Sequence, residues 1–187
     1  AQVNEPASSL TVVGSGDTMA VQNEPPTDFA SESNRTKMQE AIDHVREQFG
    51  QSYPLVINGK EVETGESIAS VDPSHQELIV GAVSAAGQQH ANDAVAAAAN
   101  ALPKWFALGA EGRAKYLRKA AEIMRRRRFE LAAWIVHECG KSWPSADGDV
   151  TEAIDFIEFY RASAMRMDTS HGVDVPGEEN RIYYTPC

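Results

Sequence analysis

The chain has 187 residues, of which 42% are hydrophobic and 24% are charged, and its formal net charge is −10 at pH 7. These values are typical of a globular protein with room for one buried core, and they exclude a collagen-like chain. The acidic balance argues against nucleic acid or an anionic membrane surface as the main partner, because phosphate groups attract Lys and Arg. No stretch approaches the roughly 20 apolar residues that a membrane span requires.

The N-terminal segment and the cysteines indicate the cellular compartment in which the protein is expected. No basic stretch followed by an apolar core opens the chain, so we expect no signal peptide. Two cysteines, Cys139 and Cys187, do not make a disulfide framework, which favours a reducing compartment and hence the cytoplasm. Residues 1–32 are rich in Pro, Ser, Asn and Gly and are interpreted as a linker or arm, with residues 14–16 as flexible linker rather than a phosphate loop.

A helix and then short β elements are predicted after the arm. Ser33 is the expected N-cap and Gly50 the expected end of a helix whose apolar stripe is Met38, Ile42, Val45 and Phe49. Asn58-Gly59 between two β-prone runs predicts a hairpin, because both residues accept positive φ. Residues 68–71 and 78–83 are further strand candidates.

The rest of the chain is predicted to be mainly helical. An alanine-rich helix covers 91–102 and ends or bends at Pro103, and a second helix covers 111–128. A further segment is closed by Gly140, and the longest helix covers 147–167. That helix is apolar on more than one side, so we expect it to pack on more than one side. Residues 173–185 are interpreted as loop, turn and strand.

Several candidate sites fail on their spacing. Gly140-Lys141-Ser142 resembles the end of a phosphate-binding loop, but the required first glycine is Ile135. The run Arg125–Arg128 is interpreted as a solvated helix face. His137 and Cys139 lack a second pair of ligands, so no metal site is assigned. We interpret Cys139 as a small packing residue and give Cys187 no catalytic role.

Glu152 is the one candidate binding residue. Phe156 follows it at i+4 and Phe159 at i+7, so its carboxylate is expected on an aromatic face, away from a stripe of Val150 and Ile154. A carboxylate beside apolar surface needs a partner, which can be a cationic ligand or a structural salt bridge. Both interpretations remain open on spacing alone.

Several strings, taken in order, resemble the N-terminal part of an aldehyde dehydrogenase. They are Tyr53-Pro-Leu-Val-Ile-Asn-Gly59, Val71-Asp-Pro73, Trp105, Arg113 and Glu138-Cys-Gly-Lys141. A second set resembles the L-glutamate γ-semialdehyde (Δ1-pyrroline-5-carboxylate) dehydrogenases: Ala146-Asp-Gly-Asp149, Glu152-Ala-Ile-Asp-Phe156, Tyr160, Pro176-Gly177 and Tyr184-Thr-Pro186. Asn23-Glu-Pro25, Thr27-Asp-Phe29 and Asn34-Arg35 are similar to the approach to this domain in some bifunctional proline-utilisation proteins.

The resemblance implies an α/β fold, in which residues 33–187 form the helical and β-hairpin part and 168–187 begin an oligomerisation-type strand. It implies NAD-dependent oxidation of L-glutamate γ-semialdehyde to L-glutamate by a homo-oligomer, with Glu152 binding the amino-acid end of the substrate. The Rossmann and catalytic domains of the family correspond to sequence beyond Cys187. We therefore expect the remainder of a dehydrogenase chain as a partner, and the 187-residue chain alone to be inactive.

A second hypothesis is a stand-alone, non-catalytic binding or assembly module. Such a module would have to bury Val150, Ile154, Phe156 and Phe159 without a Rossmann sheet, which predicts a large exposed apolar patch.

Overall fold

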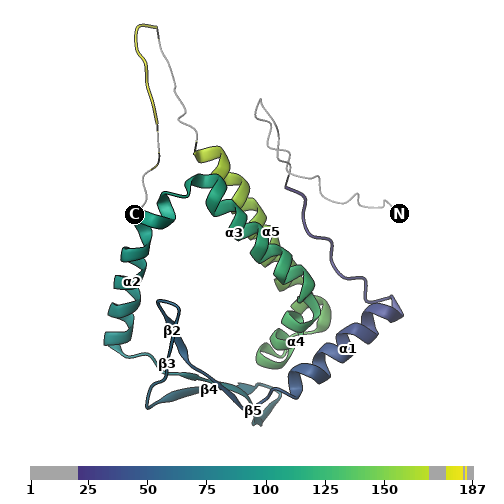
Figure 1. The fold of residues 1–187 in the computed structure, drawn as a ribbon. Coiled ribbons are helices and arrows are strands. Elements are labelled where there is room, and N and C mark those ends of the chain that lie inside the picture. The colour runs from purple at the N-terminus through teal and green to yellow at the C-terminus, as the bar shows by residue number, and fades with distance from the viewer. Residues whose placement is uncertain (1–20, 169–175, 183, 185–187) are drawn as a thin grey trace, which may run out of the picture.

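A computed structural model describes residues 21–168, 176–182 and 184, and it consists of five helices and two small sheets within these residues. In Figure 1, α2 stands on one side of the sheets, and α1, α3, α4 and α5 form a packed group on the other. In chain order the elements are α1 (Glu32–Arg46), β1 (Gln51–Tyr53), β2 (Leu55–Ile57), β3 (Lys60–Val62), β4 (Ser67–Asp72), β5 (His75–Ser84), α2 (Gln88–Phe106), α3 (Gly109–Arg126), α4 (Arg128–Cys139) and α5 (Trp143–Met167).

The strands form a three-stranded sheet in the order β1-β5-β4 and a separate β2-β3 hairpin. β5 runs parallel to β1, where Tyr53 lies opposite Val83, and antiparallel to β4. The predicted turn is confirmed: Asn58 and Gly59 join the hairpin strands with φ of 53° and 72°. Two consecutive residues with positive φ match the right-handed twist of the strands on either side.

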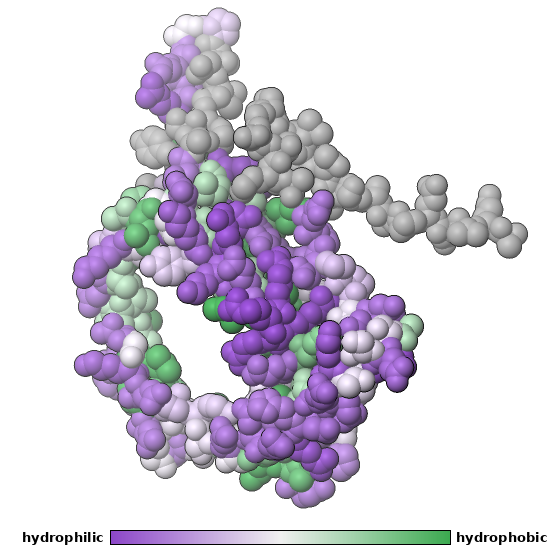
Figure 2. Space-filling view, turned by 45° about the vertical axis from the view of Figure 1, so that its right-hand side comes forward, coloured by the Kyte–Doolittle hydropathy of each residue, from purple (hydrophilic) through white to green (hydrophobic). Residues whose placement is uncertain are grey.

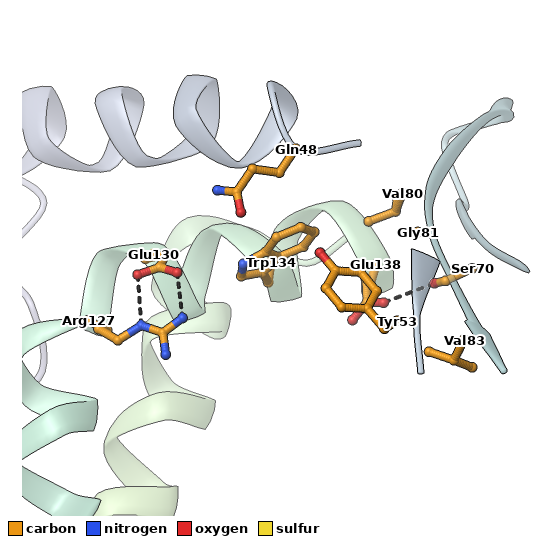
Figure 3. Close-up of a pocket in the computed structure, with 10 residues that line it drawn as sticks. All are labelled: Gln48, Tyr53, Ser70, Val80, Gly81, Val83, Arg127, Glu130, Trp134 and Glu138. Carbon is orange, nitrogen blue, oxygen red and sulfur yellow. Dashed lines mark hydrogen bonds and ion pairs between the residues drawn. The ribbon is translucent and has the colours of Figure 1, made fainter. Parts of the chain in front are cut away.

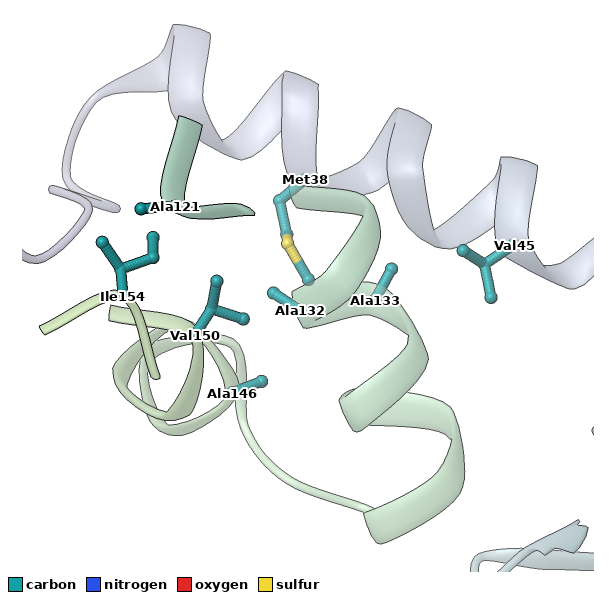
Figure 4. Close-up of a cluster of buried hydrophobic side chains, with 8 residues drawn as sticks. All are labelled: Met38, Val45, Ala121, Ala132, Ala133, Ala146, Val150 and Ile154. Carbon is teal, nitrogen blue, oxygen red and sulfur yellow. The ribbon is translucent and has the colours of Figure 1, made fainter. Parts of the chain in front are cut away.

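The core lies among the four packed helices and is built largely from small residues (Figure 4). Alanines on α3, α4 and α5 let the helix backbones approach closely around larger side chains. The buried cluster is Met38, Val45, Ala121, Ala132, Ala133, Ala146, Val150 and Ile154.

The stripe on α5 corrects one expectation. Val150 and Ile154 are 2% and 0% exposed, because the helices of this chain already cover them. Phe156 and Phe159 on the same helix remain 50% and 47% exposed. Covering Val150 and Ile154 therefore requires no Rossmann sheet, and only the aromatic side of α5 is left open.

The helix boundaries differ from prediction in ways that follow from backbone bonding. The N-cap of α1 is Ser31 rather than Ser33. α2 continues past Pro103 to Phe106, because the next backbone bond, from Ala107 N to Pro103 O at 3.0 Å, still forms. Proline removes the bond that its own N–H would donate and crowds the carbonyl one turn earlier, but it leaves its own carbonyl free to accept the next bond. Gly140 ends α4 with a φ of 65°, as predicted.

Helix α2 is set apart from the core and contains no buried residue. Figure 2 shows an opening between the side that holds α2 and the rest of the molecule, with hydrophobic residues along parts of its rim. The exposed large apolar residues on α2 and in the turn after it are Val95, Trp105, Phe106 and Leu108. In the part of the chain that the structure describes, no helix is long and apolar enough to cross a membrane.

The C-terminal segment is described only at 176–182 and 184. A turn at Pro176-Gly177 agrees with the predicted one, and Ile182 forms an isolated β-bridge. The predicted oligomerisation strand stays a prediction. Residues 14–16 and Cys187, which were also considered in the sequence, lie outside the described residues.

Candidate functional site

Glu152 lies on the exposed side of α5, opposite the buried Val150 and Ile154. The helical spacing therefore places it where the sequence predicted, beside the half-exposed rings of Phe156 and Phe159. Its role as a binding residue stays a prediction.

The aromatic side of α5 is a contiguous surface. The rings of Phe156 and Tyr160 stack with centroids 6.0 Å apart, and Phe159 meets Tyr160 edge-on at 5.5 Å. Because Tyr160 contacts both phenylalanines, the three rings form one apolar face, which we call the α5 aromatic face. A face of this kind beside a carboxylate suits a ligand with a cationic group on an apolar body.

The positive charge near Glu152 is already engaged by another residue. Lys141 Nζ donates to Asp149 Oδ2 at 2.5 Å, and this hydrogen bond is the main cause that raises the pKa of Lys141. Glu152 adds only a smaller electrostatic contribution to that shift. Among the described residues, Glu152 forms no ion pair, so the structural salt bridge considered from the sequence has no partner there.

A buried ionic cluster fixes the first turns of α5 and was missed from the sequence. Arg128 Nε and Nη2 donate to the two carboxylate oxygens of Asp147 at 2.6 and 2.7 Å. Thr27 donates to the same carboxylate from its backbone N at 2.8 Å and from Oγ1 at 2.7 Å. Burial raises the pKa of Asp147, but the hydrogen bonds from Arg128 and Thr27 outweigh it, so the pKa lies below its ordinary value.

This cluster also holds the described end of the predicted arm against the helices. Glu24 accepts from Arg125 Nε at 2.8 Å, and its backbone N donates to Asp155 Oδ1 at 2.6 Å. Phe29 packs against Trp143 with ring centroids 6.0 Å apart. In Figure 1 this segment runs from the N-terminal side down to α1. Residues 21–30 thus act as a docked strap.

The arginine run is corrected by the same contacts. α3 ends at Arg126 and α4 begins at Arg128, so the run spans a helix junction rather than one helix. Arg125 pairs with Glu24 and Glu158, Arg127 with Glu130, and Arg128 with Asp147. Arg125, Arg126 and Arg127 are exposed, as the prediction of a solvated face requires. The prediction is wrong for Arg128 alone, which is 13% exposed and bonded to Asp147.

His137 and Cys139 lie near the end of α4, in different surroundings. His137 contacts the edge of Phe49 and lies 3.3 Å from the Ile42 carbonyl, so its ring serves helix packing. Cys139 is exposed at the end of α4, and its interpretation as a packing residue is wrong. In the described ranges no group of three His, Cys, Asp or Glu residues could hold a metal ion.

The fold and the comparisons agree on the class of protein. The chain matches the aldehyde dehydrogenase family over residues 60–187 and belongs to that family. It is 43% identical over 166 residues to 1-pyrroline-5-carboxylate dehydrogenase 1 of Halalkalibacterium halodurans, covering 88% of this chain and 32% of that protein.

Solved structures give the same picture. A Thermus 1-pyrroline-5-carboxylate dehydrogenase with bound NAD matches with a TM-score of 0.79 and 44% identity, over 86% of this chain and 31% of that one. Proline utilization A from Bdellovibrio bacteriovorus matches with a TM-score of 0.81 and 37% identity, over 86% and 17% of the two chains. The chain spans about a third of the length of the curated relatives that it matches.

Proposed function

We propose that this chain forms part of an NAD-dependent dehydrogenase that oxidises L-glutamate γ-semialdehyde to L-glutamate in proline degradation. The observation that carries the proposal is its 43% identity, over 88% of its length, to a protein named as a 1-pyrroline-5-carboxylate dehydrogenase. Further relatives with that name, from Oceanobacillus iheyensis and Bacillus subtilis, are 40% to 42% identical. Pyrroline-5-carboxylate is the cyclic form of the semialdehyde.

In the proposed enzyme, Glu152 receives the ammonium group of the substrate. Its carboxylate is exposed and is not neutralised by Lys141, which is bonded to Asp149. The α5 aromatic face beside it would exclude water from the contact and strengthen the attraction between the two charges. Glu152 thereby orients the amino-acid end of the substrate, while the aldehyde end points to the catalytic groups.

The described residues do not fit a dinucleotide. Their one connection from a strand to a helix, between β5 and α2, spans residues 85–87 and holds a single glycine, Gly87. A dinucleotide-binding turn requires several glycines so that the backbone can approach the pyrophosphate. We therefore assign NAD, which accepts the hydride when bound, to other parts of the complete enzyme and derive no step through it from this chain.

The partners and the compartment are part of the proposal. We infer that the remainder of a dehydrogenase chain packs against this part, that the enzyme is a homo-oligomer, and that it works in the cytoplasm. The α5 aromatic face supports the first inference, because three contacting exposed rings favour burial in a larger assembly.

The test is a substrate comparison in the complete enzyme. Glu152→Ala should lower kcat/KM for L-glutamate γ-semialdehyde by roughly 10- to 150-fold, the value of a charge-assisted contact of about 1.5–3 kcal/mol. For 5-oxopentanoate, which has the same chain, carboxylate and aldehyde but no ammonium group, kcat/KM should change little. Glu122→Ala removes an exposed carboxylate from α3 and serves as the control. Equal losses with both aldehydes would show that Glu152 is structural.

A second candidate function is the stand-alone binding or assembly module. The sequence had counted against such a module, because Val150 and Ile154 were expected to need a Rossmann sheet to cover them. In the structure both residues are buried within this chain, so this objection no longer applies. NADH formation from L-glutamate γ-semialdehyde by the purified complete protein would exclude this candidate. A complete protein that is inactive with every aldehyde tested would favour it.

A further inference from the structure

A hollow lies between α4 and the three-stranded sheet, in a different part of the fold from Glu152 (Figure 3). Its volume is about 350 Å³, which falls in the range of roughly 300–1,000 Å³ that small-molecule sites occupy. One wall is a single face of α4 and the residue before it, where residues recur at intervals of three and four. These are Arg127, Glu130, Trp134 and Glu138. The facing wall and rim are Tyr53, Ser70, Val80, Gly81, Val83 and Gln48.

Two aromatic rings face the hollow from opposite walls. Tyr53 comes from β1, and Trp134 comes from α4 (Figure 3). Gly81 defines where the Tyr53 ring lies, because a Cβ at that position would come within 3.3 Å of Tyr53 Cε2. Because Gly81 has no side chain, the Tyr53 ring can lie close to β5 at this position. The π faces of tyrosine and tryptophan attract cations.

The charges that line the hollow do not cancel. Arg127 donates from Nε and Nη2 to both carboxylate oxygens of Glu130, at 2.9 and 2.6 Å, so this pair is internally neutral. Glu138 accepts from the Ser70 hydroxyl at 3.0 Å. Within the described part of the chain, no Lys or Arg lies at ion-pairing distance from Glu138. The hollow therefore holds one carboxylate without a counter-charge, next to two rings.

We propose that this hollow is a binding site for a small organic cation that carries an ammonium group on an apolar body. The ammonium group donates to Glu138, and the body lies between Trp134 and Tyr53. A neutral molecule of the same shape loses the charge-assisted hydrogen bond, and an anion is repelled. A metal ion is a poor occupant, because it needs three or more ligands and the hollow offers one unpaired carboxylate.

The proposal is tested by direct binding to the complete protein. Isothermal titration with benzylammonium should show binding in roughly the millimolar range, while benzyl alcohol, its neutral counterpart of the same shape, should bind about 10-fold more weakly or not at all. Glu138→Gln should weaken benzylammonium binding by about 10-fold. The control Glu61→Gln, which removes an exposed carboxylate from β3, should leave it unchanged.

Two further variants separate the aromatic contribution from a folding defect. Tyr53→Leu should weaken benzylammonium binding by about 2- to 5-fold, because it removes one cation–π contact, and Tyr53→Phe should bind like the unmodified protein. Circular dichroism checks that each variant is folded. Equal binding of benzyl alcohol, equal effects of Glu138→Gln and Glu61→Gln, or no binding by the complete protein would each overturn the proposal. None of these readouts depends on the dehydrogenase activity.

Discussion

Replacing Asp147 tests how the strap and two helices are joined. The side chain of Asp147 is 3% exposed and that of Arg128 is 13% exposed, so their ion pair lies largely out of water. Asp147→Ala removes all four hydrogen bonds to the carboxylate and leaves the guanidinium of Arg128 without this partner. Breaking a buried pair on one side costs about 3–5 kcal/mol, because a desolvated charge remains.

The assay is urea unfolding of the 187-residue chain, followed by circular dichroism. For an m-value of about 2 kcal/mol/M, the midpoint should fall by about 1.5–2.5 M. Asp149→Ala is a matched control two residues away. Asp149 and its partner Lys141 are 38% and 40% exposed, so solvent screens their attraction and losing this pair should lower the midpoint much less. If both variants lower the midpoint by the same amount, burial does not set the strength of the Asp147 cluster and the reasoning is wrong.

Three further predictions rest on single features. The pKa of Asp147 is lower in the folded state than in the unfolded chain, where it is about 3.9. Asp147 therefore stabilises the fold fully above about pH 3.9, and this contribution is lost as the pH falls through the folded-state pKa. Asp147→Asn removes the titrating group, so the free energy of unfolding should fall less steeply in acid. Gly140→Ala should cost about 1–2 kcal/mol, measured as a lower Tm, because φ is 65° and the new Cβ would lie 3.1 Å from Pro73 Cγ. Gly148→Ala, inside α5 with nothing within 4 Å, should instead raise Tm slightly, and a fall at both glycines would contradict the argument. The isolated chain should bind a hydrophobic dye through the α5 aromatic face, and replacing Phe156 and Phe159 with serine should reduce that binding; weak binding that the change does not alter would contradict this.

The sequence alone was sufficient for features that depend on neighbouring residues. Asn58-Gly59 predicted the hairpin turn, because its conformation depends on two residues that tolerate positive φ. The helical period placed Glu152 and the two phenylalanines on one side of α5, and Val150 and Ile154 on the other. The ordered set of short motifs was also enough to indicate the aldehyde dehydrogenase family, which the comparison over residues 60–187 confirms.

The ion pairs and the walls of the hollow depended on which segments pack together. The sequence did not show this, because the periodicity of one helix does not identify the helix or strand that it contacts. Thr27 and Arg128 lie 120 and 19 positions from Asp147, yet both donate hydrogen bonds to its buried carboxylate. No local pattern showed that the arginine run spans a helix junction, or that Arg125 and Arg128 pair with carboxylates far from them in the sequence. Neither wall of the hollow was singled out from the sequence. The helical period puts Trp134 and Glu138, four residues apart, on one face of α4, but the opposite wall depends on how the strands pack against that helix.

Local conformation, the faces of the helices and the family could therefore be predicted from the order of residues along the chain. The burial of charges, the covering of Val150 and Ile154 within this chain, and the hollow that Glu138 shares with Tyr53 depended on how distant segments pack. Turn and helix preferences come from residues a few positions apart. Burial and ion pairing come from residues that the folding of the whole chain brings together.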